Sequence, residues 1–291
     1  MTVKPPLRNV GASVRQRLLN LSRADGGPSF NSLLTRYVLE RLLYRLTLTP
    51  HADRFVLKGA MLVTTWFADP HRQTRDVDLL GFGNPAPDAM LAVFQDACTI
   101  QLDDGVNIDV AGLRVDLIRE VLDYGGLRLR TTATVAGARV TIVVDIGFGD
   151  ATEPGIEDVD LPVLLDQPAP HLKAYARETV IAEKFQAMIV LGLANTRYKD
   201  FYDLWMLSRA YSFEDDRLAR AIRATFARRR TAIPTVLPDA FTAAFAGDLQ
   251  KRQQWASYVA DLGSPDLDLS QIISDLAAFL MPHAGQARGL R

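Results

Sequence analysis

Apolar residues recur along this chain with two different periods, which separate helical from extended stretches. Near the start they return every three or four positions, a spacing that gathers them on one face of a helix. This predicts helices over residues 8–23 and 29–47. Between residues 112 and 150, apolar and polar positions alternate instead, which is typical of half-buried strands. The helical spacing returns from residue 178 onward.

The middle of the chain contains the extended segments. A short strand is predicted over 55–58, then a helix that starts at Gly59, a strand over 76–82, and a turn and helix over 83–98. The alternating part divides at "YGG" and "AGA" into strands that we expect to form an antiparallel meander. These strands are predicted over 112–120, 125–135 and 138–150. Further helices are predicted over 178–193, 198–210, 217–230, 238–262 and 270–281.

This order of elements, helices, then a mixed sheet, then helices, predicts an α+β fold. The 291 residues are enough for two modest domains. We expect an N-terminal helical segment over 1–50, a core built on a mixed β-sheet over 51–168, and a helical C-terminal domain over 169–291.

Composition narrows the classes of function. A net charge of −1 gives no overall positive field, so contact with nucleic acid has to use a local patch. A single cysteine, Cys98, excludes an internal disulfide and favours a cytoplasmic protein. The four histidines lack metal-ligand spacing. No apolar run is long enough to span a membrane, and the first residues lack the apolar core of a signal peptide.

Asp76 and Asp78 stand at the beginning of the strand predicted over 76–82. Residues two apart in a strand point to the same face, so these carboxylates are expected side by side. Either a divalent cation or solvent has to make this arrangement tolerable. The pair therefore predicts a metal site or a solvated strand end.

Asp145 follows a run of β-branched apolar residues in "TIVVDIGFGD". A carboxylate inside such a strand is rarely buried without a partner. Together with Asp76 and Asp78 it predicts an oxygen cage for Mg²⁺, with Mn²⁺ as a second suitable ion. The competing interpretation pairs Asp145 with Arg128 or Arg130 across the meander.

Lys58 and Gly59 form a strand-to-helix turn in "LKGAM". A glycine lets backbone N–H groups approach a phosphate, and the start of a helix favours negative charge. We expect this turn to bind substrate phosphate; a plain turn glycine is the alternative.

Charged residues also interrupt the helices of the C-terminal half. Lys184 lies in an apolar helix, which predicts an anionic ligand, and we expect its removal to cost nucleotide affinity without cost in stability. Asp200 and Asp203 share a helix face. Arg197 lies at the start of that helix, where the macrodipole disfavours a cation unless an anionic ligand or the acids offset it. The alternative is a solvated, self-paired helix start.

The densest basic segment is "RLARAIRATFARRR" over 217–230. Arg217, Arg220 and Arg223 share one helical stripe, which Arg228–Arg230 extend. The stripe predicts a track for an RNA backbone, or else a solvated face.

Taken in order, the motifs "KGA", "TRDVDL", "VDIGFGD", "AEKFQAM" and "RYKDFYDL" resemble those of the AbiEii/AbiGii-type nucleotidyltransferase toxins. This family lies within the DNA-polymerase-β-like nucleotidyltransferase superfamily. The resemblance covers residues 8–230 and implies a nucleotidyltransferase core with a mixed β-sheet, N-terminal helices and a helical C-terminal half. One departure is Ala60, which stands where the superfamily often has serine. A hydroxyl contact to phosphate is then missing, and backbone amides would have to serve.

The resemblance also implies roles for single residues. Asp76 and Asp78 would be the metal-binding catalytic pair, with Asp145 as a third, less uniform carboxylate. Thr74 would occupy the hydroxyl position ahead of the pair, and Arg75 would lie near the triphosphate. In the C-terminal half, Lys184 would contact nucleotide phosphates. Asp200 would be a further functional acid, with Asp203 close by.

The resulting prediction is a Mg²⁺-dependent nucleotidyltransferase that acts as the toxin of a toxin–antitoxin pair. It would transfer a nucleoside monophosphate from an NTP to an acceptor, for which the resemblance points to RNA and particularly the tRNA 3′ end. An antitoxin encoded next door is the expected protein partner, and no membrane is involved. Two alternatives stay open: a catalytically weak nucleotide- or partner-binding module of the same fold, and a transferase that modifies a small molecule.

Overall fold

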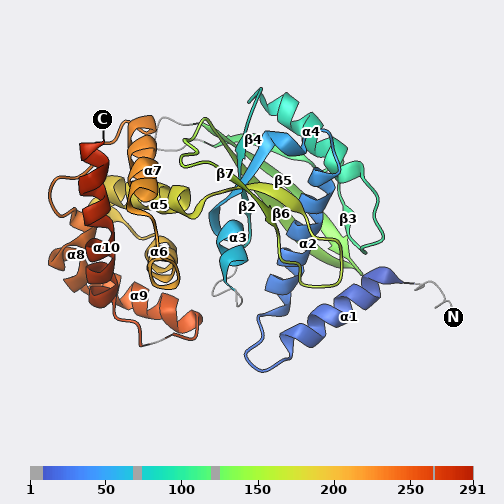
Figure 1. Ribbon diagram of the computed structural model, residues 1–291. Helices are drawn as coiled ribbons and strands as arrows, with labels where there is room; N and C mark the ends of the chain where they lie inside the picture. Colours follow the sequence, from blue (N-terminus) through green and yellow to red (C-terminus); the bar gives the residue numbers. More distant parts are fainter. Residues whose placement is uncertain (1–8, 68–73, 119–124, 265, 291) are drawn as a thin grey trace. The chain divides into compact units, whose positions relative to one another are not determined.

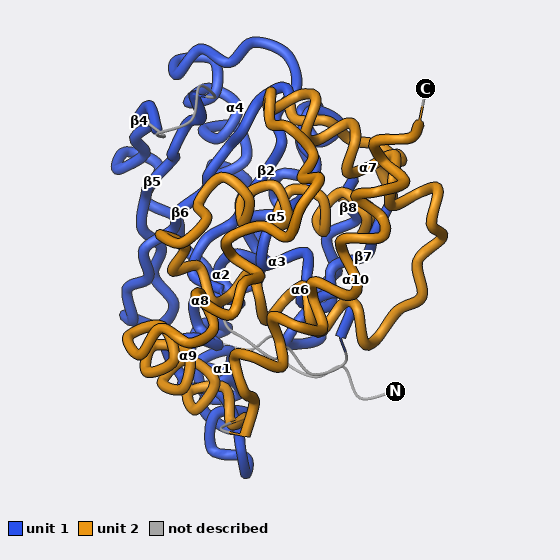
Figure 2. The backbone as a smooth tube through the Cα atoms, turned by 90° about the vertical axis from the view of Figure 1, so that its left-hand side faces the viewer, with its two compact units in different colours: residues 1–149, 158–174 blue, residues 150–157, 175–291 orange. Residues whose placement is uncertain are grey.

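The computed structural model describes residues 9–67, 74–118, 125–264 and 266–290 (Figure 1). The chain divides into two compact units (Figure 2). Unit 1 comprises residues 1–149 and 158–174, and unit 2 comprises residues 150–157 and 175–291. Parts of two predicted elements, residues 8 and 119–120, lie outside the described residues.

Unit 1 is built on a mixed β-sheet whose strands run in the order β3-β5-β6-β2-β1-β8-β7, with β4 also paired to β5. The strands are β1 (Phe55–Lys58), β2 (Val77–Gly81), β3 (Asn107–Ile108), β4 (Arg114–Ile118), β5 (Gly126–Val135), β6 (Ala138–Phe148), β7 (Ile156–Asp160) and β8 (His171–Tyr175). The predicted antiparallel meander is confirmed as β4-β5-β6. β2 runs parallel to β6 and antiparallel to β1, and β1 runs parallel to β8.

Three of these strands, β3, β7 and β8, were not predicted. β3 has two residues, too few for an alternating pattern. β7 is acidic and largely exposed, and β8 carries Lys173 between apolar residues; whether such segments become strands depends on their neighbours. β8 lies beside β1, and residues up to Ala174 belong to unit 1, so the boundary predicted at residue 168 falls before this strand. The N-terminal helices belong to the same unit as the sheet.

Helices α1 (Val10–Ser22), α2 (Phe30–Thr47) and α4 (Pro87–Thr99) lie where the sequence predicts helices. The side chains of Asn9 and Ser29 cap α1 and α2 by accepting hydrogen bonds from backbone N–H groups of the first turn. α1 packs against β5, α2 against β6 and α4 against β4.

Alternation along β5 and β6 gives the sheet one buried and one polar face. Ile142, Val144 and Ile146 of β6 are fully buried. Successive side chains of a strand point to opposite faces, so Asp145 and its β5 neighbour Arg128 lie on the other face. The charged residues of the meander are therefore gathered on the polar face.

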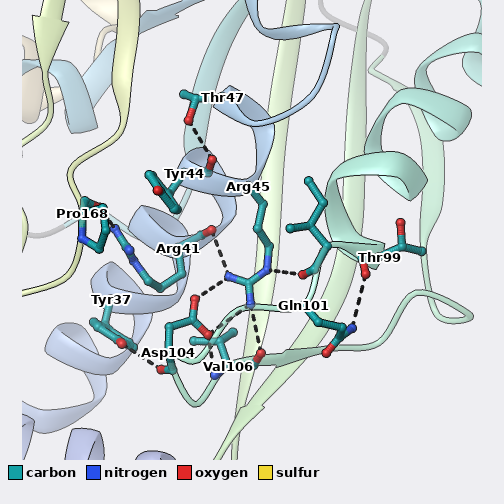
Figure 3. Close-up of polar contacts among 11 residues, drawn as sticks. Tyr37, Arg41, Tyr44, Arg45, Thr47, Thr99, Gln101, Asp104, Val106 and Pro168 are labelled. Atoms are coloured by element: carbon teal, nitrogen blue, oxygen red, sulfur yellow. Dashed lines mark hydrogen bonds and ion pairs between the residues drawn. The ribbon is translucent and has the colours of Figure 1, made fainter.

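A buried ion pair joins α2 to the segment between α4 and β3 (Figure 3). Arg45 donates to both carboxylate oxygens of Asp104, at 2.6 and 3.1 Å, and each residue is only 1% exposed. Arg45 also donates to the carbonyl oxygens of Ile100 and Val106, and the Tyr37 hydroxyl donates to the carbonyl oxygen of Asp104. These bonds satisfy charged groups whose burial would otherwise be very costly.

Unit 2 is mainly helical. It contains α5 (Arg177–Leu191), α6 (Tyr198–Ala210), α7 (Asp215–Arg228), α8 (Ala243–Gly247), α9 (Leu249–Asp261) and α10 (Leu269–Gly289). The single helix predicted over 238–262 is wrong, because Thr242 and Asp248 act as N-caps and divide it. α10 continues through Pro282, beyond its predicted end. Among the described residues, no helix is long and apolar enough to cross a membrane.

Breaking the buried ion pair should destabilise the protein strongly. We expect Arg45→Met to lower the free energy of unfolding by about 3–5 kcal/mol, because Asp104 is left buried without its counter-charge. Arg17→Met is the matched control, since Arg17 pairs with Asp166 at the surface, where ion pairs contribute little. Urea unfolding followed by circular dichroism measures both variants. Equal midpoints for the two would contradict a stabilising role of the buried pair.

Candidate active site

The strand register of unit 1 places charged residues from neighbouring strands side by side. Lys58 on β1 lies opposite Asp78 on β2, and Asp78 lies next to Asp145 on β6. Asp145 in turn lies opposite Arg128 on β5. Directly paired residues on neighbouring strands point to the same face. One charged row therefore crosses the polar face, in the order positive, negative, negative, positive. It consists of Lys58, Asp78, Asp145 and Arg128.

Asp76 lies one residue before β2, beside this charged row. The Thr74 hydroxyl is within 3.0 Å of both the carbonyl oxygen and a carboxylate oxygen of Asp76. Thr74 is buried, Asp76 is half-buried, and Arg75 between them is exposed. The predicted hydroxyl position thus holds the Asp76 carboxylate directly.

The Asp78 carboxylate lies against the backbone of Gly59. A Cβ atom on Gly59 would meet Asp78 Oδ2 at 1.9 Å, so no other residue fits there without displacing the acid. Gly59 also has a φ of +68°, a conformation that favours glycine. The turn is followed by α3 (Gly59–Val63), a helix of five residues with Ala60 buried in its first turn. Any phosphate contact therefore rests on the open backbone more than on the dipole of a long helix.

Asp145 forms the ion pair that was the alternative to metal binding. Arg128 donates through Nε and Nη2 to the two oxygens of Asp145 at 2.6 and 2.5 Å. Arg130 bonds to Asp116 instead. Among the described residues, no three histidine, cysteine or acidic side chains are grouped to hold a metal ion. A cage of three carboxylates is thus not preformed among the described residues, and the metal-binding roles of Asp76, Asp78 and Asp145 stay predictions.

All three acids act electrostatically on Arg128. The hydrogen bond to Asp145 raises the pKa of Arg128, and the charges of Asp145, Asp76 and Asp78 raise it further, while burial opposes them. The guanidinium is therefore a fixed positive charge within the influence of every candidate ligand of unit 1.

In unit 2, Lys184 lies between two buried acids. Its ammonium group is 2.5 Å from Asp200 Oδ1 and 2.9 Å from Asp203 Oδ2. Arg197 Nε lies 2.6 Å from the other oxygen of Asp200. We call Lys184, Arg197, Asp200 and Asp203 the lysine cluster; it contains two positive and two negative charges.

The lysine cluster corrects two expectations. Asp200 and Asp203 are 1% and 2% exposed, so the helix start is self-paired but not solvated. Lys184 has anionic partners within the protein, so the premise that it is buried without one is wrong, and we now expect its removal to cost stability. Burial alone would raise the pKa of Asp200, yet the charges of Lys184 and Arg197 outweigh it and lower that pKa.

A second cluster in unit 2 was missed at the sequence level. Arg229 lies 2.9 Å from Glu183 and 3.4 Å from Asp150, and the Tyr175 hydroxyl is within 3.4 Å of both acids. Burial and the two acids raise the pKa of Tyr175, which keeps its proton. We call Asp150, Tyr175, Glu183 and Arg229 the Arg229 cluster. An acidic residue, Glu183, inside an apolar helix was the sequence feature that could have predicted it.

At least three of the six arginines in the basic stripe form ion pairs. Arg217 bonds to Glu178 at 3.1 Å and Arg220 bonds to Glu153 at 2.9 Å, while Arg229 belongs to the cluster just described. These arginines hold parts of unit 2 together. The RNA track along residues 217–230 stays a prediction, with Arg223, Arg228 and Arg230 among its exposed arginines.

Comparison with known proteins places the chain in a class. Residues 41–280 match the family model described as "Nucleotidyl transferase AbiEii toxin, Type IV TA system". This is most of the chain, which is thus a nucleotidyltransferase. It belongs to the AbiEii toxin family of type IV toxin–antitoxin systems, as the motifs indicated.

Two crystal structures resemble the model. JHP933 from Helicobacter pylori has a TM-score of 0.50 at 16% identity, over 90% of this chain and 95% of that one, which supports the fold. A protein described as "putative nucleotidyltransferase from H. pylori" has a TM-score of 0.49 at 16% identity, over 91% and 99% of the two chains. No curated protein matches the chain.

Gly59→Ala should displace Asp78. Because the new Cβ would lie 1.9 Å from Asp78 Oδ2, we expect nucleotidyl transfer to fall by at least about tenfold, with about 1–3 kcal/mol of stability lost. Gly26→Ala is the control, since Gly26 has a similar φ of +72° but nothing within 4 Å of the added atom. Labelling from radioactive NTP and thermal unfolding measure both. Equal losses in the two variants would show that only the backbone conformation matters.

Lys184→Met should weaken the pH dependence that Asp200 gives to stability. In the wild type, the lowered pKa of Asp200 contributes stability that is present above the ordinary pKa of 3.8 and is lost as the pH falls through the folded value. Without Lys184, only Arg197 still lowers that pKa against burial and Asp203, so the folded value should move up toward the ordinary one and less stability should be lost as the pH falls. At neutral pH we expect a loss of about 3–5 kcal/mol.

The control for this variant is Lys199→Met, at an exposed position of the same helix start. Urea unfolding across a series of acidic buffers measures the wild type and both variants. If Lys184→Met and Lys199→Met have the same pH profile, the lysine cluster does not set the ionisation of Asp200.

Proposed function

We propose that this toxin transfers a nucleoside monophosphate from an NTP to an RNA acceptor, favouring the tRNA 3′ end, in a reaction that requires Mg²⁺ and accepts Mn²⁺. The observation that carries the proposal is the charged row of unit 1, where Asp78 lies against the bare backbone of Gly59. We place the reaction in the cytoplasm, where NTPs and tRNA occur together.

Asp76 and Asp78 fit a divalent cation. Both are half-buried carboxylates, and hard oxygen ligands of this kind suit Mg²⁺, which commonly combines one or two carboxylates with phosphate oxygens and water. The space that a side chain on Gly59 would fill is kept open beside Asp78. When bound, the ion would neutralise the triphosphate and polarise the reacting phosphorus centre.

The protein's own groups would position the substrates. The Gly59 backbone allows close approach of a phosphate, Lys58 and Arg75 supply positive charge, and Thr74 holds the Asp76 carboxylate. The acceptor hydroxyl oxygen attacks the α-phosphorus and its proton passes to a carboxylate of the Asp76–Asp78 pair. The bond to the β-phosphate oxygen breaks, and pyrophosphate leaves with that oxygen and its electron pair.

Residues of the lysine cluster would add phosphate contacts in unit 2. The Arg197 side chain is 50% exposed, whereas that of Lys184 is 10% exposed. We therefore assign the more accessible contact to Arg197 and a deeper one to Lys184, with Asp200 and Asp203 keeping that lysine charged and oriented.

Membership of a type IV toxin–antitoxin family supports an antitoxin, encoded by a neighbouring gene, as the protein partner. RNA as acceptor is supported by the toxin assignment, because modification of tRNA 3′ ends would stop translation. Ala60 has no hydroxyl, so phosphate contacts at this turn would come from backbone N–H groups.

Asp76→Asn and Asp78→Asn should each abolish Mg²⁺-dependent transfer while leaving the fold intact, because the amide keeps the shape and loses the charge that holds the cation. Incubation with labelled NTPs, Mg²⁺ and total RNA measures transfer, and circular dichroism checks the fold. Asp25→Asn, at an exposed position of unit 1, is the control. Wild-type transfer by either active-site variant would refute the assignment.

The same assay tests the acceptor when RNA is left out or when tRNA lacks its 3′ end. Label on intact tRNA alone supports the proposal. Label on a small molecule in the absence of RNA would replace it with the metabolite-modifying alternative, and no label with any acceptor would favour the binding module.

A further inference from the structure

The ion pair between Arg128 and Asp145 is unusually well fixed for a pair at a partly exposed site. The two residues are direct partners in the antiparallel ladder of β5 and β6, the two longest strands among the described residues. Both oxygens of Asp145 accept a hydrogen bond from the guanidinium, through Nε and Nη2. Bidentate pairs of this kind are the strongest that a carboxylate makes with a side chain.

Neighbouring charges leave Arg128 with Asp145. Asp116 is the other cross-strand neighbour of Arg128, but its carboxylate bonds to Arg130 at 3.0 Å. On the other side of the row, Lys58 is the direct neighbour of Asp78. The charged row thus sums to zero, and with Asp76 to a single negative charge.

We infer that Arg128 and Asp145 act as one neutral pair that keeps Asp145 out of metal coordination, so that the site offers two carboxylates and takes up its cation together with the nucleotide. This inference rests on the proposed function. A guanidinium attached to the sheet competes with a dissolved ion for the Asp145 oxygens and loses little freedom in doing so. Two carboxylates that lie beside two positively charged side chains attract a free cation only weakly. The triphosphate oxygens of a bound nucleotide would add the negative charge that cation binding needs.

A double-mutant cycle separates a neutral pair from a ligand. The variants are Arg128→Gln, Asp145→Asn and the combination of both, and the readout is binding of Mn²⁺ alone, measured by electron paramagnetic resonance. Arg128→Gln exposes a third carboxylate and should bind Mn²⁺ about tenfold more tightly, whereas Asp145→Asn leaves an unpaired cation and should bind it about tenfold more weakly. The combined variant restores neutrality and should bind within about threefold of the wild type.

Other results would overturn the inference. If Asp145 is a metal ligand, the combined variant stays well below wild-type affinity, because removal of Arg128 does not replace the lost ligand. If the pair lies outside the influence of the cation, all three variants bind Mn²⁺ like the wild type. Arg128→Lys keeps the charge in a residue of similar length and should stay near wild-type affinity, which guards against a fold defect in Arg128→Gln; thermal unfolding checks every variant.

Nucleotide coupling gives a second, independent readout. A non-hydrolysable NTP analogue should tighten Mn²⁺ binding at least about tenfold in the wild type and less in Arg128→Gln, where the third carboxylate already supplies negative charge. Asp78→Asn tests whether the measured Mn²⁺ binds at the proposed site, and this variant should lose most of the Mn²⁺ binding. Unchanged Mn²⁺ binding in Asp78→Asn would overturn the proposed metal site and this inference with it. Loss of binding in Asp78→Asn combined with a wild-type-like Arg128→Gln would overturn the inference alone.

Discussion

The hydrogen-bond register of β1, β2, β6 and β5 decides which charges meet in this protein. A slip of one residue between two strands turns every side chain of one of them to the opposite face. Either Asp78 or Asp145 would then point into the layer of Ile142 and Val144, where a carboxylate has no solvent and no partner. The apolar residues that fix the register therefore also fix the site, and the same alternation builds both the core and the charged row.

Charges are buried in both units, and each is held by a partner on another segment of the chain. Arg45 and Asp104 join α2 to the segment before β3, and Lys184 joins α5 to the acids of α6. Such pairs contribute little net stability over apolar replacements but penalise any packing that separates the partners. In unit 2 the pairing also keeps Asp200 ionised. Burial would raise the pKa of Asp200, but the positive charges of Lys184 and Arg197 outweigh it and lower that pKa.

Periodicity and local motifs predicted much of this architecture, including the α+β order and the meander. Local signals could not predict β8, which becomes a strand beside β1, or β7, which becomes one beside β8. They also left open whether Asp145 bonds to an arginine, since that depends on which residue of β5 lies opposite. For Lys184, helical spacing gave the apolar surroundings, but its contact with Asp200 depends on how α5 and α6 pack. Sequence periodicity therefore did not predict which side chains pair when they lie far apart in the chain.

The Arg229 cluster has a consequence for any attempt to divide the chain. Unit 2 takes residues 150–157 from the middle of the sequence and resumes at Tyr175, and Arg229 reaches both segments through Asp150 and through Glu183, which Tyr175 contacts. A fragment that begins at residue 175 would lack Asp150 and leave the guanidinium with one acidic partner fewer. Cleavage before residue 150 keeps both segments of unit 2 but removes residues 158–174 from unit 1. No single cleavage point therefore separates the two units intact, so truncation has to be replaced by a permuted or two-piece design that keeps residues 150–157 with the helices.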